Sequence, residues 1–188
     1  MADDRASPPP RILIDADACP VKDEVYRVAF RRGVAVRVVS NMRMRIPDHP
    51  LVERILVSDA FDAADDWIAA SAGPRDVVVT GDILLADRVL KAGATVIAHT
   101  GKPFTNAGIG AAIATRAIMA DLRVAADGIG GGPPPFAKAD RSRFLQALDE
   151  ALERLARGEG GPHSCSKCSP ALGMLPSSPA REWSYCSR

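Results

Sequence analysis

The hydrophobic positions of the chain form short apolar runs that alternate with longer stretches of helical periodicity. Runs such as residues 12–14 and 34–39 are continuous and rich in β-branched residues, which is typical of strands buried on both faces. The pattern predicts strands at residues 12–14, 34–39, 54–57, 76–80 and 94–98, and helices at residues 22–32, 59–70, 82–91 and 105–123. Because buried strands separated by helices pair in parallel, we predict a three-layer α/β sandwich with a mostly parallel central sheet of four to five strands.

A further helix is predicted near residue 140, and beyond it the composition changes. The helix is indicated by apolar residues at helical spacing, namely Phe144, Leu145, Leu148, Leu152 and Leu155. Residues 158–188 are rich in Gly, Pro and Ser without apolar periodicity, so we expect a disordered tail there, and residues 1–10 are expected to be disordered as well. One folded α/β domain is therefore predicted over residues 11–157.

The charge balance limits the classes of partner. The chain has 24 Lys and Arg against 23 Asp and Glu, a formal net charge of +1. A generic polyanion binder carries a large basic excess, so the balance argues against that class. The chain has no apolar run near the 18 or so residues that span a bilayer, and its first residues lack the pattern of a secretory signal. We therefore expect a cytoplasmic protein without a membrane partner.

Acidic residues gather where the predicted strands end. Asp15 and Asp17 follow the first strand, an acidic run at residues 59–66 follows the third, and Asp82 follows the fourth, with Asp87 about one helical turn further. Ligands of open parallel sheets bind outside the carboxyl ends of the strands, and right-handed crossovers bring these segments to one edge. Converging carboxylates raise one another's pKa values or recruit a cation, and Mg²⁺ suits carboxylate, water and phosphate oxygens. The spacing favours metal-assisted phosphoryl chemistry.

Each of these acids also has a purely structural interpretation. Asp82 lies between a strand and a helix, so it is placed to cap that helix. Asp59 and Asp62 lie at a helix start, where negative charge is favoured by the helix dipole. The pair of Asp15 and Asp17 is harder to explain structurally, because two acids closing a buried strand carry a desolvation penalty. Cys19, close to this pair, has no His nearby in the sequence, so we expect a small buried side chain rather than a nucleophile.

Several motifs together resemble one bacterial family. They are Ile14-Asp-Ala-Asp-Ala-Cys-Pro-Val21, Thr80-Gly-Asp-Ile-Leu-Leu-Ala86, Gly132-Pro-Pro-Pro-Phe136 and Asp140-Arg-Ser-Arg-Phe144. In this order they resemble the YaiI/YqxD family of unassigned function, over about residues 11–155. That family is thought to be related to PIN-like nucleases, which bind Mg²⁺ or Mn²⁺ through acidic clusters and cut RNA. The resemblance therefore implies a PIN-like fold, with RNA hydrolysis as an expectation by analogy.

The resemblance also implies where the metal ligands lie. The first acidic position falls on Asp15 or Asp17, the one after the third strand on Asp62 or Asp65, and the one after the fourth on Asp82 with Asp87. The candidate metal ligands are Asp15, Asp17, Asp62, Asp65, Asp82 and Asp87. The candidate catalytic residues are Asp15, Asp17 and Asp82. The implied cofactor is Mg²⁺ or Mn²⁺, and the implied partner is RNA.

Two other functions fit some of the same residues. Haloacid-dehalogenase-like phosphatases place an Asp-x-Asp after the first strand, with Asp15 here as nucleophile and Asp17 as acid/base, and a later Gly-Asp. The chain has no Lys between Lys22 and Lys91 for the phosphate-neutralising position, which weakens this alternative. The third alternative is a non-catalytic nucleic-acid or protein-binding module that keeps the acidic edge.

Basic residues near the same edge are candidate phosphate contacts. Arg43 and Arg45 lie in the loop after the second strand, Lys102 precedes the long helix, and Arg116 lies on it. Such side chains hold a nucleic-acid backbone through its phosphates. The alternative for the loop is a solvated surface, and for Arg116 a pairing with acids.

Overall fold

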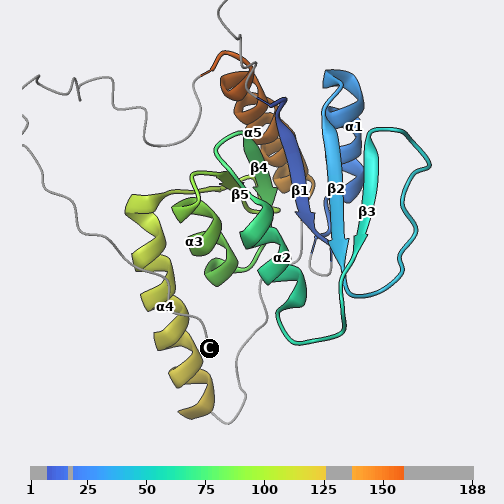
Figure 1. Cartoon of the computed structure of the whole chain (residues 1–188). Coiled ribbons are helices and arrows are strands. Elements are labelled where there is room, and N and C mark those ends of the chain that lie inside the picture. The colour runs from blue at the N-terminus through green and yellow to red at the C-terminus, as the bar shows by residue number, and fades with distance from the viewer. Residues whose placement is uncertain (1–7, 17–18, 126–136, 159–188) are drawn as a thin grey trace, which may run out of the picture.

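The computed structural model describes residues 8–16, 19–125 and 137–158. In these residues a six-stranded sheet has the order β3-β2-β1-β4-β5-β6 (Figure 1). The strands are β1 (Arg11–Asp15), β2 (Ala35–Ser40), β3 (Val52–Leu56), β4 (Asp76–Val79), β5 (Thr95–Ile97) and β6 (Pro103–Phe104). The first five are parallel, and β6 pairs antiparallel with β5. The mostly parallel sheet is confirmed; the strand beyond the predicted number is this two-residue edge strand, too short to show a period.

Helices cover both faces of the sheet. They are α1 (Lys22–Arg32), α2 (Ala63–Ser71), α3 (Ile83–Lys91), α4 (Asn106–Ala125) and α5 (Lys138–Ala156). Helices α1 and α5 pack on one face, α2 and α3 on the other, and α4 lies along α3 (Figure 1). The predicted three-layer α/β sandwich is confirmed. None of the helices in the described ranges is both long and apolar enough to cross a membrane.

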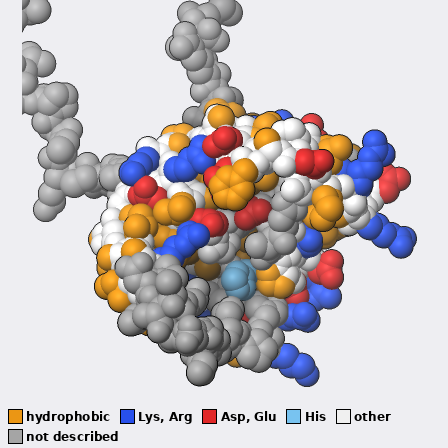
Figure 2. All heavy atoms as spheres, turned by 90° about the horizontal axis from the view of Figure 1, so that it is seen from below, with side chains coloured by type: hydrophobic (Ala, Val, Ile, Leu, Met, Phe, Trp, Pro, Cys, Tyr) orange, Lys and Arg blue, Asp and Glu red, His pale blue; other side chains and the backbone are white. Residues whose placement is uncertain are grey.

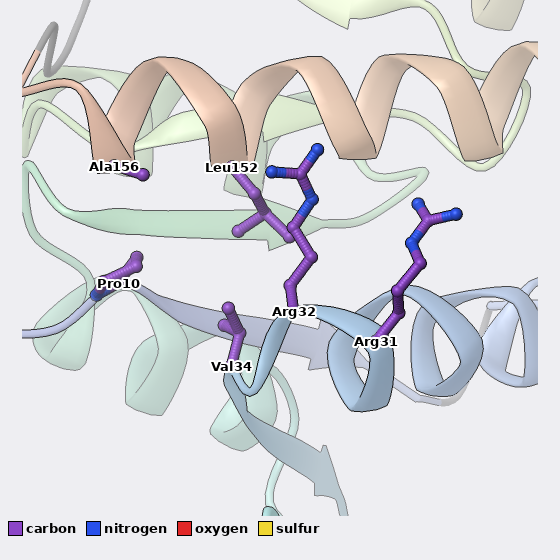
Figure 3. A pocket seen from close by; sticks show the side chains of 6 residues that line it. All are labelled: Pro10, Arg31, Arg32, Val34, Leu152 and Ala156. Atoms are coloured by element: carbon purple, nitrogen blue, oxygen red, sulfur yellow. The ribbon is translucent and has the colours of Figure 1, made fainter.

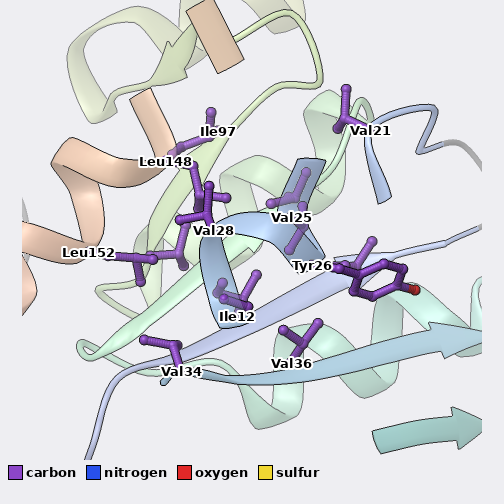
Figure 4. Packing of buried hydrophobic residues seen from close by; sticks show 14 of the residues in the cluster. Ile12, Val21, Val25, Tyr26, Val28, Val34, Val36, Ile97, Leu148 and Leu152 are labelled. Carbon is purple, nitrogen blue, oxygen red and sulfur yellow. The ribbon is translucent and has the colours of Figure 1, made fainter. Parts of the chain in front are cut away.

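Strand β1 contains a continuous apolar run because both of its faces are buried. Ile12 and Ile14 join the core on the α1 and α5 side, whereas Leu13 joins the core on the α2 and α3 side. Successive residues of a strand point to opposite faces, so a strand covered on both faces must be apolar throughout. Figure 4 shows the first of these cores, where side chains from β1, β2, α1 and α5 meet. Full burial of each large side chain contributes about 1.5–3 kcal/mol to folding.

Helix α2 begins later than the sequence predicts. The acidic run suggested a start at residue 59, but α2 starts at Ala63. Asp62 adopts a left-handed backbone conformation with φ of 59°, which an α-helix cannot continue. The turn thus formed brings Asp62 to the carboxyl edge of the sheet.

Candidate functional site

The carboxyl ends of the strands and the first turns of α2 and α3 enclose a cavity of about 240 Å³, the acidic pocket. Its lining residues are Asp15, Asn41, Ala60, Asp62, Ala63, Ala64, Asp65 and Asp82. Figure 2, which views the molecule from this side, shows acidic side chains near the middle of the face with basic side chains around them. Four of the six predicted metal ligands are thus brought to one cavity.

Asp15 is held by a buried hydroxyl group. The strand end leaves Asp15 only 7% exposed, and its Oδ2 accepts a hydrogen bond of 3.0 Å from Thr80 Oγ1. Thr80 is itself buried, and its Oγ1 accepts a bond of 3.0 Å from the backbone N–H of Asp82. Thr80 therefore links the end of β1 to the segment that carries Asp82. These bonds fix the separation of two pocket carboxylates.

Asp82 has the structural role that its position suggested, and it also lines the pocket. Its Oδ1 accepts hydrogen bonds from the backbone N–H groups of Leu84 and Leu85, at 2.6 and 3.3 Å, and so caps α3. Arg116 of α4 pairs with the same carboxylate at 3.3 Å. Both capping bonds use Oδ1, whereas Oδ2 is in the longer 3.5 Å contact with Arg116. The capping and ligand interpretations are compatible.

Asp62 precedes α2 without capping it. In the described structure of α2, the Asp62 side chain accepts no hydrogen bond from the first backbone N–H groups. Its left-handed conformation costs about 1 kcal/mol relative to the right-handed one for a residue with a Cβ. Such strained positions cluster at functional sites, where the surrounding structure holds them. A capping role therefore does not explain Asp62.

The half-buried carboxylate of Asp65 responds most strongly to its surroundings. Burial, followed by the negative charges of Asp15, Asp82 and Asp62 in that order, raises the pKa of Asp65 to about 6. Arg88 acts in the opposite direction and lowers the pKa of Asp65. The pocket therefore concentrates negative charge that the nearby cations do not neutralise. A divalent cation would relieve that repulsion.

The remaining predicted acids are not in this cavity. Asp87 faces Lys91 one helical turn away, with Oδ2 at 2.6 Å from Nζ, and does not line the acidic pocket. Asp17 lies outside the described residues. Within the described residues, no three His, Cys, Asp or Glu side chains form a group that could hold a metal ion as they stand.

The predicted phosphate contacts are dispersed. Arg43 and Arg45 are exposed in the loop after β2, and neither forms an ion pair with another described residue. Arg116 reaches the pocket through its pair with Asp82. Lys102 is exposed and lines a neighbouring cavity. Only Arg116 touches an acidic-pocket residue directly.

Two polar residues of the site were missed by sequence reasoning. Asn41 lines the acidic pocket at the end of β2, and Thr80 bonds to Asp15. Both directly follow or end a parallel strand, and that placement was the available signal. Both side chains are uncharged, so a pattern of clustered acids does not include them.

Cys19 is buried as expected. It is 6% exposed, and burial raises the pKa of its thiol to about 11. The thiolate is the nucleophilic form of cysteine, so this side chain is inert at neutral pH.

A larger hollow lies toward the amino ends of the strands. Its volume is about 460 Å³, and Figure 3 shows its lining residues, among them Arg31 and Arg32. Both guanidinium groups pair with Asp149 at 2.6 Å, and the pairing lowers the pKa of Asp149. Since its cations are already neutralised, this hollow is a weaker candidate for a phosphate site.

Comparisons with known proteins identify the relatives of the chain. Residues 13–154 match the family model described as "Uncharacterized BCR, YaiI/YqxD family". A "UPF0178 protein" of Sphingopyxis alaskensis is 70% identical over 149 residues, covering 79% of this chain and 97% of that protein. A "UPF0178 protein" of Nitrobacter winogradskyi is 56% identical over 147 residues, covering 78% of this chain and 93% of that protein.

No solved structure matches the chain significantly. The family match covers the sheet from Leu13 of β1 onward, the acidic pocket and α5 up to Arg154. The chain is a member of the YaiI/YqxD family of uncharacterised proteins.

Proposed function

We propose that the protein is a divalent-metal-dependent nuclease that hydrolyses RNA phosphodiester bonds at the acidic pocket. The observation that carries the proposal is the meeting of Asp15, Asp62, Asp65 and Asp82 around one small cavity. There, burial together with the charges of the other three carboxylates raises the pKa of Asp65 to about 6. Perturbed carboxylates in a cavity are typical of functional sites.

The donor set fits Mg²⁺ or Mn²⁺. Carboxylate oxygens are the ligands that these cations prefer, and Mg²⁺ commonly binds one or two carboxylates while keeping several waters. That mode agrees with a described pocket that offers carboxylates without a ready-made group of three ligands. One or two of the carboxylates of Asp15, Asp62, Asp65 and Asp82 would hold the cation, and a bound cation would neutralise phosphate charge and lower the pKa of a bound water.

The reaction requires that a water oxygen bond to phosphorus while the bond from phosphorus to one ribose oxygen breaks. The attacking water loses a proton to solvent, and the departing ribose oxygen gains one, so a phosphate monoester and a hydroxyl result. Arg116, paired with Asp82, supplies positive charge beside the pocket, and the exposed Arg43 supplies it in the loop that begins at Asn41. Both contribute to attraction of the polyanionic chain.

The phosphatase alternative uses the same carboxylates. Asp15 lines the acidic pocket and is the residue that would serve as nucleophile. Among the residues that line the pocket there is no Lys to neutralise a transferred phosphate, so hydrolysis by water is favoured over a covalent aspartyl intermediate. A non-catalytic binding module is the remaining alternative.

Titration calorimetry with Mn²⁺ tests the metal site through a single carboxylate. Asp62→Asn removes a charge while keeping a residue that tolerates the left-handed conformation, so we expect it to weaken Mn²⁺ binding by roughly tenfold or more. Asp66→Asn is the matched control, because Asp66 lies in the first turn of α2, which follows Asp62, but pairs with Arg88 and does not line the pocket. Equal Mn²⁺ binding by wild type and Asp62→Asn, or no binding at all, would contradict the proposed metal site.

The reaction class is tested with two substrates in the presence of Mn²⁺. Wild type is expected to shorten a labelled single-stranded RNA on a denaturing gel, and Asp62→Asn to do so far more slowly. Hydrolysis of p-nitrophenyl phosphate without RNA cleavage would favour the phosphatase. Metal binding without either reaction would favour the binding module.

A further inference from the structure

A second cavity, the apolar pocket, adjoins the acidic pocket. Its volume is about 360 Å³, and most of its lining is apolar. Gly81 and Ile83 line the apolar pocket, while Asp82 between them lines the acidic one. The two cavities therefore lie on either side of the short segment that joins β4 to α3. A volume near the lower limit for small-molecule sites suits one compact group.

The walls of the apolar pocket form a place for a flat ring. Phe104 of β6 and Ile83 of α3 line it, and both are half-buried against the hydrophobic core. The small side chains of Ala98 and Ala112 also line the cavity. Aromatic side chains stack on nucleobases, and every base offers a face for such stacking.

The rim of the apolar pocket is polar and positively charged. Lys102 lines the cavity, is exposed, and has no ion pair with another described residue. Thr100 and Thr105 also line the cavity, and the Oγ1 of Thr105 accepts a hydrogen bond of 3.2 Å from the N–H of Gly108. A cation suits a phosphate, and hydroxyl groups suit the polar edge of a base.

The pocket is preformed by a rigid turn between β5 and β6. The N–H of Ala98 donates to Lys102 O at 2.9 Å, and the N–H of Gly101 donates to Ala98 O at 2.8 Å. Gly101 has φ of 80° and lies so close to α5 that an added Cβ would be 2.5 Å from the backbone of Phe144. This contact fixes the turn against α5, so the site needs little ordering when a ligand binds.

We propose that the apolar pocket binds the nucleobase of a nucleotide next to the cleaved phosphate. The base lies against Phe104, its polar edge meets the threonine hydroxyl groups, and Lys102 contacts a backbone phosphate. Consecutive residues of the chain line the two cavities, so a base and an adjoining phosphate can occupy both at once. This inference rests on the proposed function. It adds that the protein recognises one unpaired nucleotide of its RNA substrate.

Calorimetric binding of adenosine 5′-monophosphate, with Mg²⁺ present, tests the proposal without cleavage. Ala112→Leu fills the pocket, so we expect it to weaken nucleotide binding at least about tenfold. Ala111→Leu is the matched control, because Ala111 is the exposed neighbour on α4 and does not line the pocket. Circular dichroism melting checks that both variants fold. Ribose 5-phosphate, which lacks the base, is expected to bind wild type at least about tenfold more weakly than the nucleotide.

The outcomes separate this inference from the nuclease proposal. Unchanged nucleotide binding in Ala112→Leu, equal binding of ribose 5-phosphate, or no nucleotide binding by wild type would each overturn the base pocket. RNA cleavage that persists alongside such a result leaves the nuclease in place. Nucleotide binding that depends on residue 112, without RNA cleavage, supports the base pocket and contradicts the nuclease proposal.

Discussion

Asp62 and Asp65 lie one helical turn apart, and each is held in a state that an isolated aspartate avoids. Asp62 has a left-handed backbone, and burial together with the neighbouring carboxylates raises the pKa of Asp65 to about 6. Both states reduce the stability of the folded protein in the absence of a bound cation. The acidic pocket thus lowers the free energy of unfolding, which is typical of a binding site.

The raised pKa of Asp65 predicts a pH dependence of stability. Between its ordinary pKa of 3.8 and about 6, the folded state holds more protons than the unfolded state, so the free energy of unfolding falls as pH rises through this window. Above about pH 6, the folded protein carries the full free-energy cost of the ionised Asp65 side chain. Asp65→Asn should remove the penalty and raise the free energy of unfolding at pH 7.5 by up to about 1 kcal/mol, after allowance for screening by solvent.

Urea denaturation in EDTA measures this effect. The gain of Asp65→Asn over wild type should disappear at pH 4, where the wild-type carboxyl is protonated in the folded state. Asp66→Asn serves as the control, since Asp66 is exposed and pairs with Arg88, and it should give no gain at pH 7.5. A gain that does not change with pH would contradict the assigned cause.

Among the elements, the turn from β5 to β6 connects the two sides of the molecule. It carries Lys102 and leads into Phe104 at the apolar pocket, and its Gly101 contacts α5 on the opposite face of the sheet. Phe144, beside that contact, is fully buried in the core of the α1 and α5 side. The turn that carries the rim of the apolar pocket is therefore packed directly against α5.

Gly101→Ala should be strongly destabilising. Its Cβ would meet the backbone of Arg143 and Phe144 at 2.5 Å, and its φ of 80° disfavours any residue with a side chain. We expect a loss of at least about 2 kcal/mol in the free energy of unfolding, measured by urea denaturation. Gly110→Ala is the contrasting variant, because nothing lies within 4 Å of its added Cβ and α4 is helical there. It should gain about 0.5–1 kcal/mol. Equal effects of the two would refute the close contact.

At the scale of the whole molecule, the described domain has a hydrophobic cluster on each face of its sheet. The buried residues of both hydrophobic clusters lie between Ile12 and Leu155. A chain that ends at Gly158 should therefore melt within about 2 °C of the full chain, by circular dichroism. A markedly lower melting temperature would show that residues 159–188 contribute to the fold, against the expectation of a disordered tail.

The layers of the molecule were predictable because strands that are buried on both faces leave a clear hydrophobic pattern in the sequence. Strand β1 had to be apolar throughout, and the acids that follow buried strands had to lie at one edge. The short edge strand β6 and the left-handed turn at Asp62 were not predictable, because two residues show no period and Asp is compatible with either backbone. The pairing of Asp87 with Lys91 was visible in the sequence as an i,i+4 pair. Its position about one helical turn after Asp82, together with the family resemblance, had placed it among the candidate metal ligands.

The turn at Asp62 has a consequence for how this position can evolve. The left-handed backbone admits Gly, Asn and Asp most readily, and among these only Asp carries a negative charge. Lineages that retain a carboxylate there are thus confined to one amino acid, whereas lineages that have lost the need for charge are free to drift to Asn or Gly. The identity of residue 62 in any homologue therefore records whether selection for the acidic pocket has continued.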